Sequence, residues 1–214
     1  MGRRALRKPD PSLDLTGYLL SFDDLPQPLQ TTALFGRSGP LEIEVGSGKG
    51  LFLQNAAIRH PDRLYLGTEV AQKYARHAAG RLAKCGLTGA KIVVSDALRV
   101  FSERIAEASL AAVHVYFPDP WWKKRHKKRR VMVPAFLKDI ERALEPGGRL
   151  HFWTDVEEYF HSTLELIAAE TDLAGPFDVP EMPPEHDLDY RTHFERRTRL
   201  AGGPVYRAEF ERKP

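Results

Sequence analysis

The chain has 214 residues, of which 42% are hydrophobic and 29% are charged, so it is long enough for one α/β domain with a small appendage and lies far from disordered or collagen-like compositions. No apolar run approaches the roughly 18 residues of a membrane span. Its one cysteine, Cys85, can close no disulfide within the chain and build no cysteine-type zinc site. The net charge is only +3 and the basic N-terminus leads into no apolar segment, so we expect a cytoplasmic protein whose charges matter by their positions.

Short β-rich segments alternate with longer segments of helical periodicity from residue 41 onward. We interpret residues 1–38, which are rich in proline, glycine and polar residues, as an N-terminal arm or cap before a domain of residues 39–214. The predicted strands are Leu41–Val45, Leu64–Glu69, Lys91–Val94, Val113–Phe117 and Arg149–Thr154. The predicted helices are residues 50–59, 71–85, 98–107, 134–144 and 156–169.

Helices of this length between strands require crossover connections, which predicts a doubly wound, mostly parallel sheet covered on both faces. Near the C-terminus, residues 204–212 alternate polar and apolar side chains with a period of two, and we expect them to add an antiparallel strand. The proline-rich residues 176–184 are predicted to form a long loop.

The first predicted strand runs into a glycine-rich loop, Glu44-Val-Gly46-Ser-Gly48-Lys-Gly50. Glycines allow a sharp turn and close approach to a ligand, and in open parallel sheets ligands bind outside the carboxyl ends of the strands. The spacing differs from the G-x-G-x-x-G of dinucleotide-binding loops and from the G-x-x-x-x-G-K-[ST] of loops that hold nucleoside triphosphates. A plain tight turn is the alternative interpretation.

Acidic residues stand at the ends of the first three predicted strands, at Glu44, Glu69 and Asp96. An acid after the second strand can accept hydrogen bonds from both ribose hydroxyls of an adenosine, and an acid after the third can accept from the adenine amino group. Each acid alone is more often a helix N-cap. Together, with Lys49 as the only cation in the loop, they favour an adenosine without phosphates. S-adenosylmethionine fits, because its amino group and sulfonium are cations.

The fourth predicted strand is followed by Pro118-Asp119-Pro120-Trp121-Trp122 and then by a basic run, residues 123–130, in which seven of eight residues are Lys or Arg. Prolines on both sides restrict the backbone of Asp119, which suits a carboxylate that must be held in one place for catalysis. The tryptophans could stack on a base and the cations could contact phosphates. A solvated charged tail or a localisation signal is the alternative interpretation of the run.

This segment resembles the signature of the tRNA (guanine-N7)-methyltransferases over Phe117-Pro-Asp-Pro-Trp121-x-Lys123-x-Arg125-His126-x-Lys128-Arg-Arg130. Two further segments match the same family, Thr154-Asp155 and Thr192-His-Phe194-Glu195-Arg-Arg197. With the glycine loop and the strand-end acids, the resemblance covers residues 41–212, whereas residues 1–38 match no motif of the family. The basic signature is specific to this family; the glycine loop is shared by many methyltransferases.

The resemblance implies a class I, Rossmann-like methyltransferase that moves a methyl group from S-adenosylmethionine to N7 of a guanine in the variable loop of tRNA. It implies that Asp119 is catalytic and also contacts the cofactor. The other implied cofactor contacts are Glu44, Gly46, Gly48, Gly50, Glu69 and Asp96. The implied substrate contacts are Lys123, Asp155, Thr192, His193, Phe194 and Glu195. The implied RNA-binding residues are Arg125, His126, Lys127, Lys128, Arg129 and Arg130.

Guanine N7 has an in-plane lone pair and no proton, so its attack on the methyl group needs no base, and we expect Asp119 to act by positioning or electrostatically. We expect tRNA as partner, no membrane and no metal, and a monomer or homodimer. Glu158-x-x-His161 is only half of a di-iron motif, and a solvated helix face explains it better.

Two other functions remain open at this point. One is methylation of an exocyclic amine, because such enzymes place a similar polar-Pro-aromatic turn after the fourth strand; the Pro-Asp-Pro-Trp turn and its basic tail argue against this. The other is RNA binding without catalysis by a decayed site, against which the intact glycine loop and the strand-end acids argue.

Overall fold

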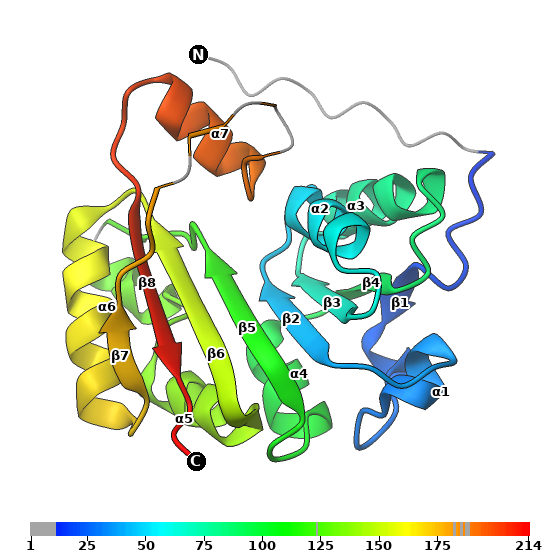
Figure 1. Cartoon of the computed structure of the whole chain (residues 1–214), viewed down its shortest axis with the longest axis horizontal. Coiled ribbons are helices and arrows are strands. Elements are labelled where there is room, and N and C mark those ends of the chain that lie inside the picture. Colours follow the sequence, from blue (N-terminus) through cyan, green and yellow to red (C-terminus); the bar gives the residue numbers. More distant parts are fainter. Residues whose placement is uncertain (1–11, 123, 182, 185, 187–188) are drawn as a thin grey trace.

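The computed structural model of the chain is built on one eight-stranded sheet with the strand order β1-β4-β3-β2-β5-β6-β8-β7 (Figure 1). The structure describes residues 12–122, 124–181, 183–184, 186 and 189–214. The strands are β1 (Leu19–Ser21), β2 (Leu41–Val45), β3 (Leu64–Glu69), β4 (Ala90–Val94), β5 (Leu110–Tyr116), β6 (Leu144–Thr154), β7 (Ala174–Phe177) and β8 (Tyr206–Glu211). The α-helices are α1 (Thr31–Phe35), α2 (Leu51–Arg59), α3 (Gln72–Lys84), α4 (Ala97–Arg104), α5 (Pro134–Ala143), α6 (Glu157–Glu170) and α7 (His193–Leu200).

The pairing of the strands confirms the predicted fold class. Strands β1 to β6 pair in parallel, whereas β8 runs antiparallel to β6, as expected for the C-terminal strand. All five predicted central strands and all five predicted helices are present. The largest difference is in β6, which begins at Leu144 and includes the turn at Gly147 and Gly148; its register against β5 shifts between the pairs Leu110↔Leu144 and Ala112↔Arg149.

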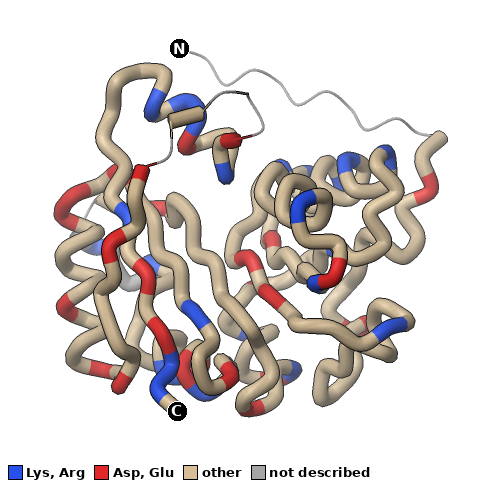
Figure 2. The backbone as a smooth tube through the Cα atoms, viewed as in Figure 1, with Lys and Arg blue, Asp and Glu red and all other residues tan. Residues whose placement is uncertain are grey.

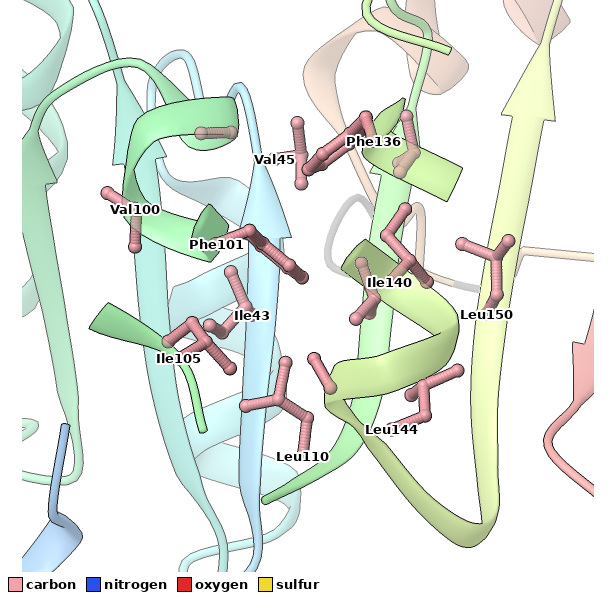
Figure 3. Close-up of a cluster of buried hydrophobic side chains, with 14 of the residues drawn as sticks. Ile43, Val45, Val100, Phe101, Ile105, Leu110, Phe136, Ile140, Leu144 and Leu150 are labelled. Carbon is pink, nitrogen blue, oxygen red and sulfur yellow. The ribbon is translucent and has the colours of Figure 1, made fainter. Parts of the chain in front are cut away.

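Helices cover the two faces of the sheet, as crossover connections require. On one face, apolar side chains of β2, β5 and β6 pack against α4 and α5 (Figure 3). Strand β2 shows the alternation: Leu41, Ile43 and Val45 belong to this core, while Glu42 and Glu44 point to the opposite face, where α2 and α3 form a second core cluster.

One prediction for an irregular segment needs correction, and one helix was missed. Pro176 and Phe177 do not belong to a loop: they end β7, which pairs with β8 at the edge of the sheet. Proline is tolerated on an edge strand because its missing N–H can face away from the ladder, so the Gly-Pro sequence misled the prediction. Helix α7, on the 192–197 motif, was not predicted; Thr192 is its N-cap and accepts a hydrogen bond from the N–H of Glu195 (3.0 Å).

Part of the predicted N-terminal arm packs against the sheet. Strand β1 extends the sheet beside β4, and Phe22, Leu25 and Leu29 are buried in the larger core cluster. None of the described helices combines the length and the apolar character that a bilayer-spanning helix requires.

Candidate active site

The loop between β2 and α2 turns sharply at three glycines. Gly46, Gly48 and Gly50 have φ angles of 75°, 52° and 70°, in the left-handed region that favours glycine. The backbone N–H groups of Gly46 and Ser47 both donate to the carbonyl of Thr68 in β3, over 3.0 and 2.9 Å. The loop is therefore held against the carboxyl end of β3.

Gly50 is also the point at which α2 approaches α3. A Cβ atom there would lie 2.7 Å from Cβ of Ala78. We expect Gly50→Ala to lower the free energy of unfolding by about 2 to 4 kcal/mol, because the left-handed backbone and the steric overlap both cost energy. The matched control is Gly36→Ala, since Gly36 has a φ of 72° but nothing within 4 Å of the added Cβ; about 1 kcal/mol should be lost. Equal losses in urea unfolding would contradict the contact with α3.

The acids that follow β3 and β4 hold backbone N–H groups. One carboxylate oxygen of Glu69 accepts from Gly48 (2.9 Å) and the other from Ala71 (2.8 Å), so Glu69 orders the glycine loop. Asp96 accepts from Leu98 (3.0 Å) and is the N-cap of α4. Both acids thus have local structural roles, and both also line a cavity.

Two cavities open at the carboxyl edge of the sheet. The first, of about 490 Å³, is lined by Glu69, Asp96 and Asp119 and is called the acidic cavity here. The second, of about 390 Å³, is called the α7 cavity because residues 192–194 face Glu44 across it. The two cavities share Gly46, Tyr116 and Phe117.

Two glutamates on the same face of β2, Glu42 and Glu44, have pKa values that are shifted in opposite directions. Burial alone would raise the pKa of Glu42, but hydrogen bonds from His114 (2.7 Å) and Arg63 (2.5 Å) outweigh it and lower the pKa to about 2. Glu44 is only 3% exposed, and its Oε2 has no hydrogen-bond partner among the described residues. Burial, with a smaller contribution from the charge of Glu69, raises the pKa of Glu44 to about 8. An unpartnered buried carboxyl beside a cavity marks a place for a cationic group.

Asp119 lies on a strained turn at the end of β5. Phe117 and Trp121 have φ angles of 51° and 46°, a conformation that non-glycine residues rarely adopt. The Asp119 side chain is exposed, lines the acidic cavity and accepts a hydrogen bond from the N–H of Trp121 (3.3 Å). The strained backbone and the two prolines therefore direct the carboxylate toward the cavity.

Arg130, the last residue of the basic run, holds this turn against α6. Its Nε donates to the carbonyl of Pro120 (2.8 Å) and its Nη2 to Glu158 on α6 (3.1 Å). The guanidinium lies over the ring of Tyr159, 4.4 Å from the centroid, and the side chain is only 9% exposed. Arg130 therefore connects the turn to α6 through contacts that use most of its donors.

The rest of the basic run is folded beside Trp121. Residues 124–129 form a 3-10 helix, in which Arg125 is exposed and the guanidinium of Arg129 lies 5.1 Å from the centroid of the Trp121 ring. The ring of His126 meets Trp121 edge-on at 5.8 Å. Lys123 lies outside the described residues, as do the side chains of Lys127 and Lys128. Arg129 and Arg130 both line the acidic cavity, so the run ends beside this cavity.

Adjacent arginines should therefore respond differently to substitution. We expect Arg130→Ala to lower kcat about 10- to 100-fold at saturating tRNA and cofactor, since the turn that carries Asp119 loses its attachment to α6. Arg129→Ala should instead raise the KM for tRNA. Steady-state methylation kinetics separate the two effects, and a change in the tRNA KM alone for Arg130→Ala would contradict the attachment.

The chain is similar in sequence and in fold to known methyltransferases. A family model described as "Putative methyltransferase" matches residues 38–208. A protein of Rhodopirellula baltica named tRNA (guanine-N(7)-)-methyltransferase is 51% identical over 219 residues, which cover 100% of this chain and 81% of that protein. A protein of the same name from Myxococcus xanthus is 38% identical, over 88% of this chain and 91% of its own length.

The chain belongs to the tRNA (guanine-N7)-methyltransferase family. Solved structures support the fold. The 16S rRNA methyltransferase KamB superposes with a TM-score of 0.61 at 18% identity, over 84% of this chain and 90% of KamB. The aminoglycoside resistance methyltransferase NpmB1 superposes with a TM-score of 0.56, also at 18% identity, over 83% of this chain and 89% of NpmB1.

The family motif on α7 divides between the two faces of the helix. Phe194 lines the α7 cavity, and its ring packs against Phe117 at 5.1 Å. Glu195, 2% exposed, points away: it accepts from the N–H of Arg191 (2.7 Å) and pairs with Arg199 (3.2 Å) and Arg207 (3.4 Å). Glu195 lines neither cavity and holds α7 over β8, so its implied contact with substrate stays a prediction.

Other predicted residues also lie outside the two cavities. Asp155, half-buried after β6, and Gly50 line neither of them in the part of the chain that the structure describes. Residues that sequence reasoning missed include Tyr116, which lines both cavities, and Tyr74 and Arg197, which line the α7 cavity. The position of Tyr116 at the end of β5 was the one available indication, because ligands bind at the carboxyl ends of such strands.

Proposed function

We propose that this chain transfers the methyl group of S-adenosylmethionine to N7 of a guanine in the variable loop of tRNA. The observation that carries the proposal is a shared lining: Gly46 of the glycine loop, Asp119 and the exposed Arg129 of the basic run all line the acidic cavity. One cavity thus brings together a glycine turn suited to an adenosine, a rigidly held carboxylate and a cation suited to RNA. Membership of the tRNA (guanine-N7)-methyltransferase family supports the same reaction.

The residues present fit S-adenosylmethionine. The Glu44 Oε2, which has no partner among the described residues, offers a site for its cationic amino group, and Glu69 and Asp96 offer acceptors for the ribose and the adenine. Gly46 lines both cavities, so its lack of a side chain leaves room between them. When bound, the cofactor supplies an electrophilic methyl group and needs no metal. The described residues contain no cluster of three or more His, Cys, Asp or Glu side chains placed to bind a metal ion.

The residues around the cavities position a base more than they move protons. Guanine N7 attacks with its own lone pair, and the purine becomes positively charged as the bond forms. The carboxylate of Asp119 lies where it can accept from a guanine N–H and stabilise that charge. Tyr116, Phe117 and Phe194 provide aromatic surfaces for the base, and the basic run binds phosphates.

Methyl transfer from labelled S-adenosylmethionine to unmodified bulk tRNA tests the proposal. Digestion to nucleosides should yield N7-methylguanosine as the labelled product. A label on an exocyclic amine would identify the alternative enzyme class. Cofactor and tRNA binding without transfer would identify an RNA-binding protein. A tRNA substrate also implies action in the cytoplasm.

A further inference from the structure

Helix α3 presents a row of exposed cations to solvent. Its apolar side, formed by Ala75, Ala78, Ala79 and Leu82, is buried, and the helix contains no Asp or Glu. Lys73, Arg76 and Lys84 are exposed, and within the described residues none of the three forms an ion pair with a carboxylate. The row spans roughly 16 Å at 1.5 Å per residue.

Two cations on the opposite face of the sheet are paired with carboxylates. On α4, Arg99 pairs with Glu103 (3.0 Å), and on α5, Lys138 pairs with Glu170 of α6 (3.1 Å). Among the described residues, Lys73, Arg76 and Lys84 have no such carboxylate partner, so their positive charge favours an anionic ligand at this face.

Contacts connect α3 to the active site. Arg81 donates to the carbonyl of Lys49 in the glycine loop (3.1 Å), and its guanidinium also contacts the ring of His193 on α7 (3.1 Å). Lys49 and Arg197 line the α7 cavity. Burial, Arg81 and Lys49 together lower the pKa of His193 to about 4, as expected where positive charge is concentrated. Figure 2 shows Lys and Arg positions on α3 and α7 at this end of the molecule.

We propose that Lys49, Lys73, Arg76, Lys84 and Arg197, here called the α3–α7 surface, bind the phosphate backbone of tRNA on the side of the active site away from the basic run. The inference rests on the proposed function, because a guanine can enter the cavities only if the flanking RNA crosses their mouth. Arg129 lies at the acidic cavity, whereas Lys49 and Arg197 of the α3–α7 surface line the α7 cavity and Lys73, Arg76 and Lys84 extend the surface along α3. The RNA is then held from both sides of the reacting base.

Salt-dependent binding of unmodified tRNA tests the surface. The variant is Lys73→Gln with Arg76→Gln, and the matched control is Arg99→Gln with Lys138→Gln, which removes the same charge from the opposite face. We expect the first variant to raise the Kd about 10-fold and to reduce the slope of log K against log salt by about 1 to 2, because each lost phosphate contact removes roughly 0.7 to 0.9. The control should keep the wild-type slope, and thermal unfolding checks that both variants fold.

The outcomes separate this inference from the proposed function. If the wild-type protein methylates tRNA at guanine N7 but the Lys73/Arg76 variant keeps the wild-type Kd and slope, the α3–α7 surface is wrong. A drop in slope of equal size for the control would also overturn it, because the effect would then reflect net charge alone. If the wild-type protein yields no N7-methylguanosine while the slope falls only for the Lys73/Arg76 variant, the proposed function fails and the surface stands.

Discussion

Asp119→Asn should reduce kcat about 100- to 1000-fold at saturating tRNA and cofactor, the loss typical of removing one group that stabilises transition-state charge. The substitution keeps the shape of the side chain and its oxygen that accepts from Trp121, so the strained turn should persist. It removes the negative charge that, in the proposed function, stabilises the purine as N7 becomes alkylated. Single-turnover methyl transfer measures the chemical step directly.

Asp96→Asn is the matched control, because Asp96 lines the same cavity and is likewise a carboxylate. Its expected effect is a higher KM for the cofactor with little change in the chemical step, since the proposed function assigns Asp96 to the adenine rather than to the guanine. A normal single-turnover rate for Asp119→Asn would show that the carboxylate does not stabilise the reaction.

Glu44→Gln should stabilise the folded protein at alkaline pH and weaken cofactor binding. The folded pKa of Glu44, about 8, lies above its ordinary value of 4.5. The favourable contribution of the protonated form is therefore complete below pH 4.5 and is lost as the pH rises through 8. Between pH 5 and pH 9 the ionisation of Glu44 should lower the free energy of unfolding of the wild-type protein by about 4 kcal/mol. The glutamine variant should show no such loss.

The same carboxyl should be coupled to cofactor binding. At pH 7 Glu44 is mostly protonated, and a cationic amino group at its free oxygen favours ionisation, so binding should release close to one more proton from the wild type than from Glu44→Gln. The variant should bind S-adenosylmethionine about 10- to 100-fold more weakly, the effect of losing one charge-assisted hydrogen bond.

Two measurements check this pair of effects. Urea unfolding at pH 5 and pH 9 compares the stabilities, and calorimetry in buffers of different ionisation enthalpy counts the protons. Glu42 and Glu209, whose folded pKa values are both about 2, titrate below this window and affect both proteins equally. Parallel stability profiles for wild type and variant between these pH values would refute the raised pKa of Glu44.

Local patterns were sufficient to predict the central strands, the helices between them, the C-terminal strand and the glycine loop. Apolar periodicity, glycines and prolines act on neighbouring residues, so the carboxyl ends of successive strands could be located from the chain alone. Because parallel strands end at one edge, Glu44, Glu69, Asp96 and Asp119 could be predicted to gather there, and the described cavities contain all four. The short edge strands β1 and β7 carry too few residues for such a pattern, and pairing with their neighbours forms them.

Only the tertiary structure showed the roles of side chains whose partners are distant in the sequence. Arg129 and Arg130 are adjacent in sequence, yet only Arg130 meets Pro120 and Glu158. Glu42 and Glu44 share one face of β2, yet His114 and Arg63 reach only Glu42. Long-range packing determines the partner of each side chain. It therefore decides which motif residues face the cavities and which ones hold the structure. The cost of burying a charge depends on those partners, which no local segment specifies.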